Sequence, residues 1–199
     1  MFGLLGKPDK KLYSVRVNSN SPNCHFAIKN SLLDFIHIAK PDWSELVVMC
    51  IGTDRSTGDS LGPLVGSKLE KLNNIESVYI MGTLEEPVHG ANLEEKLKKL
   101  EKFKNPLCIA IDACLGSLEN VSTISVGIGS LKPGAGVKKE LPEVGHIYIT
   151  GVVNVGGFME YFVLQNTRLA VVMKMANIIA NSLESTILDL TLLKTHKKA

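Results

Sequence analysis

The sequence lacks the features that mark several common classes of protein. It has no apolar run as long as the roughly 18 residues of a membrane-spanning helix, and its opening residues, MFGLLGKPDKK, contain no long apolar core. The formal net charge is only +2, which is too small to predict the broad basic surface of a nucleic-acid-binding protein. We therefore expect a cytoplasmic protein with no membrane partner and no direct contact with nucleic acid.

The cysteines lack the paired CxxC spacing that is typical of metal and redox sites. Two of them, Cys50 and Cys108, fall inside short apolar runs, where cysteine behaves as a small hydrophobic side chain. With Cys24 and Cys114, they are predicted to be reduced and structural, as in a cytosolic compartment.

The length and composition predict one domain with a substantial core. The chain has 199 residues, of which 45% are hydrophobic and 21% are charged. Residues 1–20 show no sustained hydrophobic period and are predicted to form an arm. The basic stretch 191–199 is predicted to be a frayed tail. The domain itself is expected to span residues 21–190.

A continuous apolar run at 47–51 ends in a glycine-rich loop that carries an aspartate. Such a run predicts a strand that is buried on both faces of a sheet. Gly52 ends the strand, and polar residues then lead through Asp59 to a predicted helix start. A second apolar stretch, 106–116, carries Asp112 at the end of its run. If the two strands are parallel neighbours, both carboxyls lie at one sheet edge, where open α/β sheets place their sites.

Strands and helices alternate through most of the chain. Besides the strand that leads to Asp112, strands are predicted at 47–51, 75–81, 122–126 and 146–150, and helices at 21–39, 61–73, 92–104 and 158–183. This alternation predicts an α/β fold with three αβα layers and a mainly parallel, twisted sheet of about five strands, of the phosphorylase/hydrolase-like kind.

The glycine-rich loop departs from the two common phosphate-binding patterns. A Walker A loop has four residues between its glycines and then Gly-Lys-Ser/Thr, whereas five residues separate Gly52 from Gly58 and Asp59 replaces the lysine. The dinucleotide pattern GxGxxG is also absent from this turn. Asp59 alone could be a helix-capping carboxylate, and Asp112 alone could hold loop amides. The expected position of both carboxyls at neighbouring strand ends favours a catalytic site over two separate structural roles.

Four segments resemble the germination protease family of spore-forming bacteria in their order and spacing. They are IGTDRSTGDSLGPLVG, CIAIDACLGSLENVSTISV, SLKPGAGVKKEL and HIYITGVVNVGGF. The resemblance runs from about Val47 to Leu183, and it is nearest to the short sporulation proteins related to that protease. A more distant resemblance is to the hydrogenase-maturation endopeptidases.

The resemblance to the germination protease implies an aspartic-type peptidase whose catalytic pair is Asp59 and Asp112. It implies a protein or peptide substrate, with small acid-soluble spore proteins as candidates, and a location in the forespore or spore core. We expect no cofactor, and a homo-oligomer is compatible with the sequence. The residues expected to contact substrate are Thr53, Asp54, Gly58, His89 and Gly116.

Two other interpretations stay open. The resemblance to the hydrogenase-maturation endopeptidases implies a divalent metal held by Asp59, Asp112 and a histidine. His89 is the better candidate for that ligand, because His146 begins a predicted strand. The other interpretation is a non-catalytic sporulation protein whose peptide-binding cleft docks a partner. Widely separated carboxyls, or a cleft closed by the glycine-rich stretch 127–136, would favour it.

Overall fold

A computed structural model describes residues 13–134 and 141–198 of the chain, with side chains described as far as residue 193. Its centre is a six-stranded sheet with the order β1-β5-β6-β4-β2-β3. The strands are β1 (Ser14–Asn18), β2 (Glu45–Cys50), β3 (Val78–Met81), β4 (Pro106–Gly116), β5 (Thr123–Ile128) and β6 (Ile147–Val155). Strands β3, β2, β4 and β6 are parallel, whereas β5 is antiparallel to both of its neighbours, β1 and β6.

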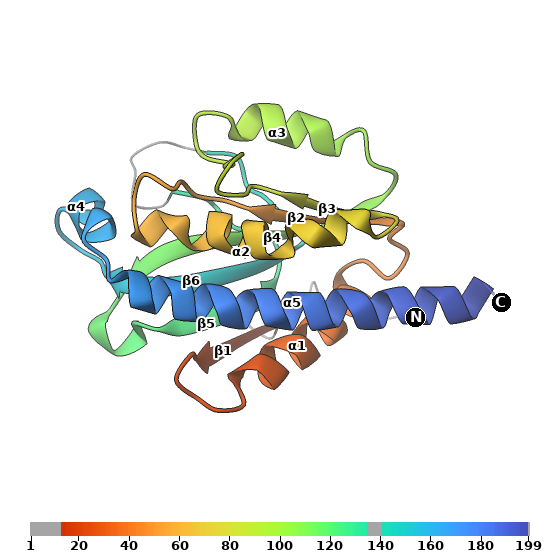
Figure 1. Cartoon of the computed structure of the whole chain (residues 1–199), viewed down its shortest axis with the longest axis horizontal. Helices are drawn as coiled ribbons and strands as arrows, with labels where there is room; N and C mark the ends of the chain where they lie inside the picture. Colours follow the sequence, from red (N-terminus) through yellow and green to blue (C-terminus); the bar gives the residue numbers. More distant parts are fainter. Residues whose placement is uncertain (1–12, 135–140, 199) are drawn as a thin grey trace, which may run out of the picture.

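Helices cover both faces of this sheet (Figure 1). The helices are α1 (Cys24–Ala39), α2 (Leu61–Leu69), α3 (Leu93–Leu100), α4 (Glu160–Gln165) and α5 (Leu169–Lys198), with single 3-10 turns at η2 (Gly58–Ser60), η3 (Glu70–Asn74) and η4 (Leu118–Asn120). Helices α1, α2 and α5 share a large core with one face, and α3 packs with Leu131 and Val144 on the other. The expected three-layer α/β architecture is confirmed.

The continuous apolar runs arise because β2 and β4 lie in the middle of the sheet and contribute to both cores. In β4, Ile109 and Ile111 face the core under α1, α2 and α5, while Cys108 and Ala110 face the core under α3. Successive side chains of a strand point to opposite faces. Asp112 therefore continues the row that faces the α3 side of the sheet.

The structure differs from the sequence prediction at both ends of the expected domain. The predicted arm, 1–20, contains β1, whose Val15 and Val17 pack against the core, while its first residues, 1–12, lie outside the described part of the chain. The predicted tail, 191–199, is largely helical, because α5 continues to Lys198; Ala199 is not described.

The predicted helix 158–183 is in fact two helices, α4 and α5, with a break at 166–168. Asn166 and Thr167 occupy this break, and the Thr167 hydroxyl donates to the Val163 carbonyl at 2.8 Å. Because of the break, α4 can lie over the end of the sheet, next to η2.

No helix in the described ranges is long and apolar enough to cross a membrane.

Helix α2 approaches the sheet closely because it carries glycine where the two backbones meet. A Cβ added at Gly62 would lie 2.1 Å from the carbonyl oxygen of Ile51, and one added at Gly66 would lie 1.9 Å from the carbonyl oxygen of Gly82. A backbone atom cannot rotate away as a side chain can. Any larger residue at either position must therefore push α2 off the sheet.

We expect Gly62→Ala to lower the free energy of unfolding by about 1–3 kcal/mol, the usual range for overpacking. Urea denaturation followed by circular dichroism measures this change. Asn181→Ala, on the exposed side of α5, is the matched control and should leave stability near the wild-type value because alanine favours helix. An unchanged denaturation midpoint in Gly62→Ala would show that α2 and the sheet are less tightly apposed than described.

Candidate active site

Asp59 is held over the end of the sheet by a loop that folds back on itself. Gly52, which ends the run of β2, has φ +145°, a conformation that favours glycine, and a Cβ added there would lie 1.9 Å from the Asp59 carbonyl oxygen. The Thr53 N–H donates to the same oxygen at 3.2 Å. Neither η2 nor α2 has a side-chain capping hydrogen bond at its start. The capping role considered for Asp59 is therefore not observed.

Asp112 lies where β4 extends beyond its neighbour β2. The last residue pair between these strands is Cys50 with Ile111, whereas β4 continues to pair with β6 as far as Gly116. The Asp112 Oδ1 accepts a hydrogen bond from the Ala113 N–H at 2.9 Å. The Gly134 N–H lies near enough to this carboxyl to oppose the rise of its pKa. The bond from Ala113 thus orients the Asp112 side chain, with a second backbone donor close by.

Both carboxyls line one cavity of about 180 Å³. Residues 112–115 of β4 form one wall, and Leu131, Lys132 and Gly134 form another part of the lining. Because four successive residues of a strand line the cavity, it borders the backbone edge of β4 and not one face alone. The predicted meeting of the two aspartates at one edge of the sheet is observed.

Three further residues of this cavity come from the carboxyl-terminal part of the chain. Thr150 of β6 and both Glu160 and Leu164 of α4 are the remaining described residues of the lining. Glu160 was not among the residues predicted for the site, because residues 158–183 were expected to form one helix packed on the sheet. Glu160 Oε1 accepts a hydrogen bond from the Gly157 N–H at 3.2 Å. It adds a third carboxyl to the cavity.

The pKa values of both aspartates lie above the ordinary value for this side chain. Burial is the main cause of a rise in the pKa of Asp112 to about 7, and the charge of Asp59 adds to it, while the N–H groups of Gly134 and Ala113 oppose it. Burial also raises the pKa of Asp59. The buried Ser56 hydroxyl lies near enough to oppose this rise, although it completes no hydrogen bond within the described residues. At neutral pH the site can therefore hold a carboxylic acid as well as a carboxylate.

Cys114 lines the same cavity but is a poor nucleophile. Burial and the charge of Asp112 raise the pKa of its thiol to about 11, and the Thr150 side chain opposes this only in part. The thiolate, which is the reactive form of cysteine, is therefore scarce at neutral pH. Asp59 and Asp112 are the carboxyls of this cavity whose pKa values are raised, which suits them to proton transfer near neutral pH.

The predicted substrate-contacting residues lie around the cavity without lining it. Thr53 and Asp54 bond to each other at the turn after β2, and Gly116 accepts a hydrogen bond from the Gly156 N–H at the end of β4. Gly58 supports the site through a close contact, since a Cβ there would lie 2.7 Å from Leu164 Cδ2. None of these residues is among the described ones that line the cavity.

His89 is also outside the cavity lining. It lies just before α3. The ring Nδ1 of His89 accepts a hydrogen bond from the Ala91 N–H at 3.2 Å, and the backbone N–H of His89 donates to Asn92 Oδ1 at 2.9 Å. In the part of the chain that the structure describes, no three His, Cys, Asp or Glu side chains are grouped as metal ligands would be. The set Asp59, Asp112 and His89 thus does not fit a three-ligand metal site in this arrangement.

Comparison with solved structures shows the same fold in a hydrogenase maturation protease. The crystal structure of a [NiFe] hydrogenase maturation protease, HycI from Thermococcus kodakarensis KOD1, superimposes with a TM-score of 0.50 and 18% sequence identity. The match covers 77% of this chain and 98% of that one. At this level of identity, the likeness establishes the fold.

Sequence comparison identifies a much nearer relative. The chain is 58% identical over 142 residues to "Uncharacterized protein YyaC" of Bacillus subtilis (strain 168), a match that covers 71% of this chain and 69% of the relative. The model of the family described as "Protein of unknown function (DUF1256)" matches residues 16–182. This match includes every strand from β2 to β6 and both aspartates of the cavity. The chain therefore belongs to the DUF1256 family.

Proposed function

We propose that the protein is a peptidase that hydrolyses peptide bonds with Asp59 and Asp112 as its catalytic pair. The observation that carries this proposal is that two carboxyls from separate segments line one small cavity, each with a raised pKa. Perturbed acids in a cleft are typical of catalytic sites. The fold shared with a maturation protease supports the assignment.

The two carboxyls have different roles in this mechanism. Asp112, whose pKa is about 7, carries the proton and donates it to the carbonyl oxygen of the scissile bond. Asp59 is ionised and removes a proton from the attacking water, whose oxygen adds to the carbonyl carbon. When the tetrahedral intermediate collapses, the C–N bond breaks, Asp59 gives its proton to the leaving amine, and Asp112 takes back the proton of the former carbonyl oxygen, which restores the C=O bond and the starting state of the pair. Two close acids share their titration, so the pair acts as a unit.

The substrate that we propose is a spore protein, and small acid-soluble spore proteins are the first to test. The proposed location of the reaction is the forespore or the spore core. The resemblance of the loops around Asp59 and Asp112 to the germination protease supports this choice. We further propose that hydrolysis needs no metal, because the two carboxyls can themselves supply an acid and a base. A chelator should then leave the cleavage rate unchanged, and a loss of activity that added divalent metal restores would replace the aspartic mechanism with a metal-assisted one.

We expect Asp59→Asn and Asp112→Asn each to slow cleavage of a small acid-soluble spore protein by roughly 100-fold or more, since each removes a proton-transfer group. Cleavage is followed by gel electrophoresis and mass spectrometry. Asp34→Asn, an exposed position on α1, is the matched control and should cleave at the wild-type rate. Wild-type activity in either cavity variant would exclude the two-aspartate mechanism. If the wild-type protein bound the substrate without cleaving it, the docking interpretation would replace it.

Stability should depend on pH through the half-buried Asp112 carboxyl. Because its folded-state pKa of about 7 exceeds the ordinary 3.8, the folded state holds more protons than the unfolded state between these values. The free energy of unfolding should then fall as pH rises from about 4 to about 7, by up to about 1.4 kcal/mol per pH unit. In the variant Asp112→Asn, the free energy of unfolding, measured by urea denaturation at each pH, should fall less steeply as the pH rises. Parallel curves for the two proteins would show that Asp112 titrates normally.

A further inference from the structure

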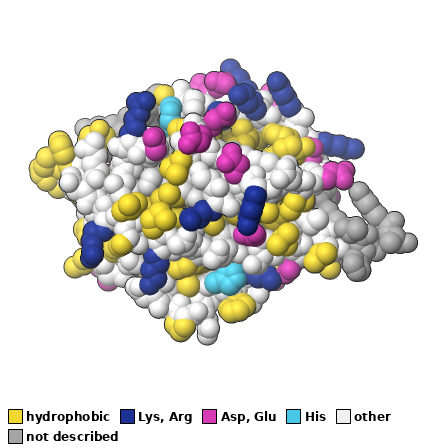
Figure 2. Space-filling view, in the orientation of Figure 1, with side chains coloured by type: hydrophobic (Ala, Val, Ile, Leu, Met, Phe, Trp, Pro, Cys, Tyr) yellow, Lys and Arg dark blue, Asp and Glu magenta, His cyan; other side chains and the backbone are white. Residues whose placement is uncertain are grey.

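The segment that joins β6 to α5 exposes an unusual amount of apolar side chain. Phe158 is 82% exposed, Met159 53%, Tyr161 61% and Phe162 54%. Figure 2 shows yellow side chains gathered at the end of the molecule where Figure 1 places α4. Contiguous exposed apolar surface of this kind is typical of interaction sites.

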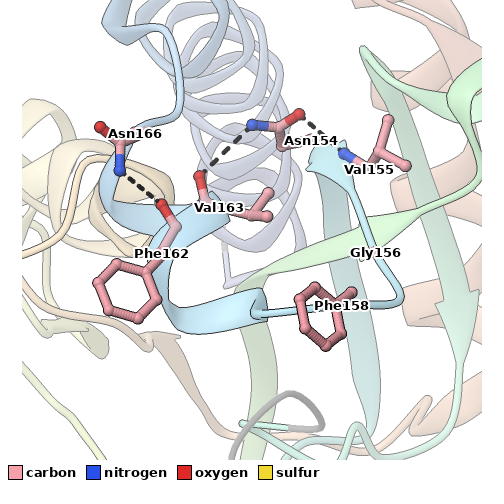
Figure 3. A pocket seen from close by; sticks show the side chains of 7 residues that line it. All are labelled: Asn154, Val155, Gly156, Phe158, Phe162, Val163 and Asn166. Carbon is pink, nitrogen blue, oxygen red and sulfur yellow. Dashed lines mark hydrogen bonds between the residues drawn. The ribbon is translucent and has the colours of Figure 1, made fainter.

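This surface borders a hollow of about 540 Å³ between the end of β6 and α4 (Figure 3). Its volume lies in the range of ligand-binding clefts. The described lining contains Phe158, Phe162 and Val163 from the α4 side and no charged side chain. The hollow is therefore suited to an uncharged, apolar group.

The walls of the hollow are fixed by hydrogen bonds. The Asn154 amide donates to the Val163 carbonyl at 3.4 Å and to Thr167 Oγ1 at 3.2 Å, which ties the end of β6 to α4. The Asn166 amide donates to the Phe162 carbonyl at 2.8 Å. Met159 has φ +49°, a rare and costly conformation for a residue with a side chain. Met159 is the residue from which the chain enters α4, and it lies in the sequence between Phe158 and Phe162.

The hollow neighbours the acid cavity, because α4 contributes to the lining of both. Glu160 and Leu164 of this helix line the acid cavity, while Phe162 and Val163 line the hollow. The ends of β4 and β6 also link the two sites, since Leu115 of the acid-cavity wall pairs with Asn154 of the hollow. From Asp112 to Leu115, an extended chain advances about 10 Å, at roughly 3.3 Å per residue.

We propose that this hollow is a specificity pocket that receives a large apolar side chain of the substrate polypeptide, about three residues from the scissile bond. This inference rests on the proposed peptidase function, and it assigns to the hollow the choice of substrate. The acid cavity holds the bond to be cut, and the uncharged hollow selects for phenylalanine or leucine and against aspartate or lysine. Phe162 is the principal specificity-determining residue.

The test measures binding apart from cleavage. The protein is the full chain carrying Asp112→Asn, and the probes are fluorescein-labelled nine-residue peptides of glycine, serine and alanine. One position at a time is replaced by phenylalanine, leucine, aspartate or lysine, and Kd is measured by fluorescence anisotropy. We expect phenylalanine and leucine at one position to bind at least 10-fold more tightly than aspartate or lysine at that position.

A second substitution locates this preference in the hollow. Phe162→Ala, added to the same chain, should reduce the preference at least threefold, and its exposed position means that the fold should persist, as circular dichroism can verify. Leu118→Ala removes an apolar side chain that is 75% exposed and outside the described lining of the hollow, so it should change nothing. Equal binding of all peptides, no detectable binding, or equal effects of the two substitutions would overturn the proposal.

Two further measurements separate this proposal from its alternatives. Cleavage of the same peptides by the wild-type protein tests the proposed function independently. Selective binding without cleavage would contradict the peptidase function alone, and cleavage without selective binding would contradict the specificity pocket alone. Sedimentation velocity tests self-association. A wild-type dimer that Phe162→Ala dissociates would show that the hollow receives a second copy of this chain, and would overturn the specificity pocket.

Discussion

The site depends on the removal of water from the Asp112 carboxyl, which lies just beyond the point where β4 stops pairing with β2. Strand β4 extends past the end of β2, so Asp112 leaves the apolar interior but stays enclosed by Gly134, α4 and the loop that carries Asp59. Removal of water from this carboxyl is the largest contribution to its pKa of about 7. The remaining features of the site serve this arrangement, since they either enclose Asp112 or bring a second carboxyl to it.

Glycine allows the required close contacts. Gly52 lets the loop turn back onto the Asp59 carbonyl, and Gly62 lets α2 lie directly on the strand end. Gly58 leaves room for Leu164 of α4. The loop that carries Asp59 is thus packed between the sheet on one side and α4 on the other. The same short helix lines the acid cavity and the apolar hollow, which is why we assign chemistry and substrate choice to neighbouring surfaces.

The sequence was sufficient to predict the α/β architecture and the meeting of the two aspartates, because the apolar runs before Asp59 and up to Asp112 carry strong local signals. It was insufficient where tertiary contacts decide the outcome. Glu160 enters the cavity only because the chain breaks at 166–168, and Gly134 reaches Asp112 from a loop without regular structure. By contrast, β1 could have been found, since SVRVN alternates polar and apolar residues as an edge strand does.

Asp59 and Asp112 are expected to influence each other's ionisation across the cavity that they share. Carbon-13 NMR titration of the aspartate carboxyl groups, in the wild-type protein and in Asp59→Asn, tests it most directly. We predict that the Asp112 carboxyl titrates near pH 7 in the wild-type protein and has a lower pKa once the charge at position 59 is removed. An Asp112 resonance that titrates near pH 4, or one that Asp59→Asn leaves unchanged, would contradict it.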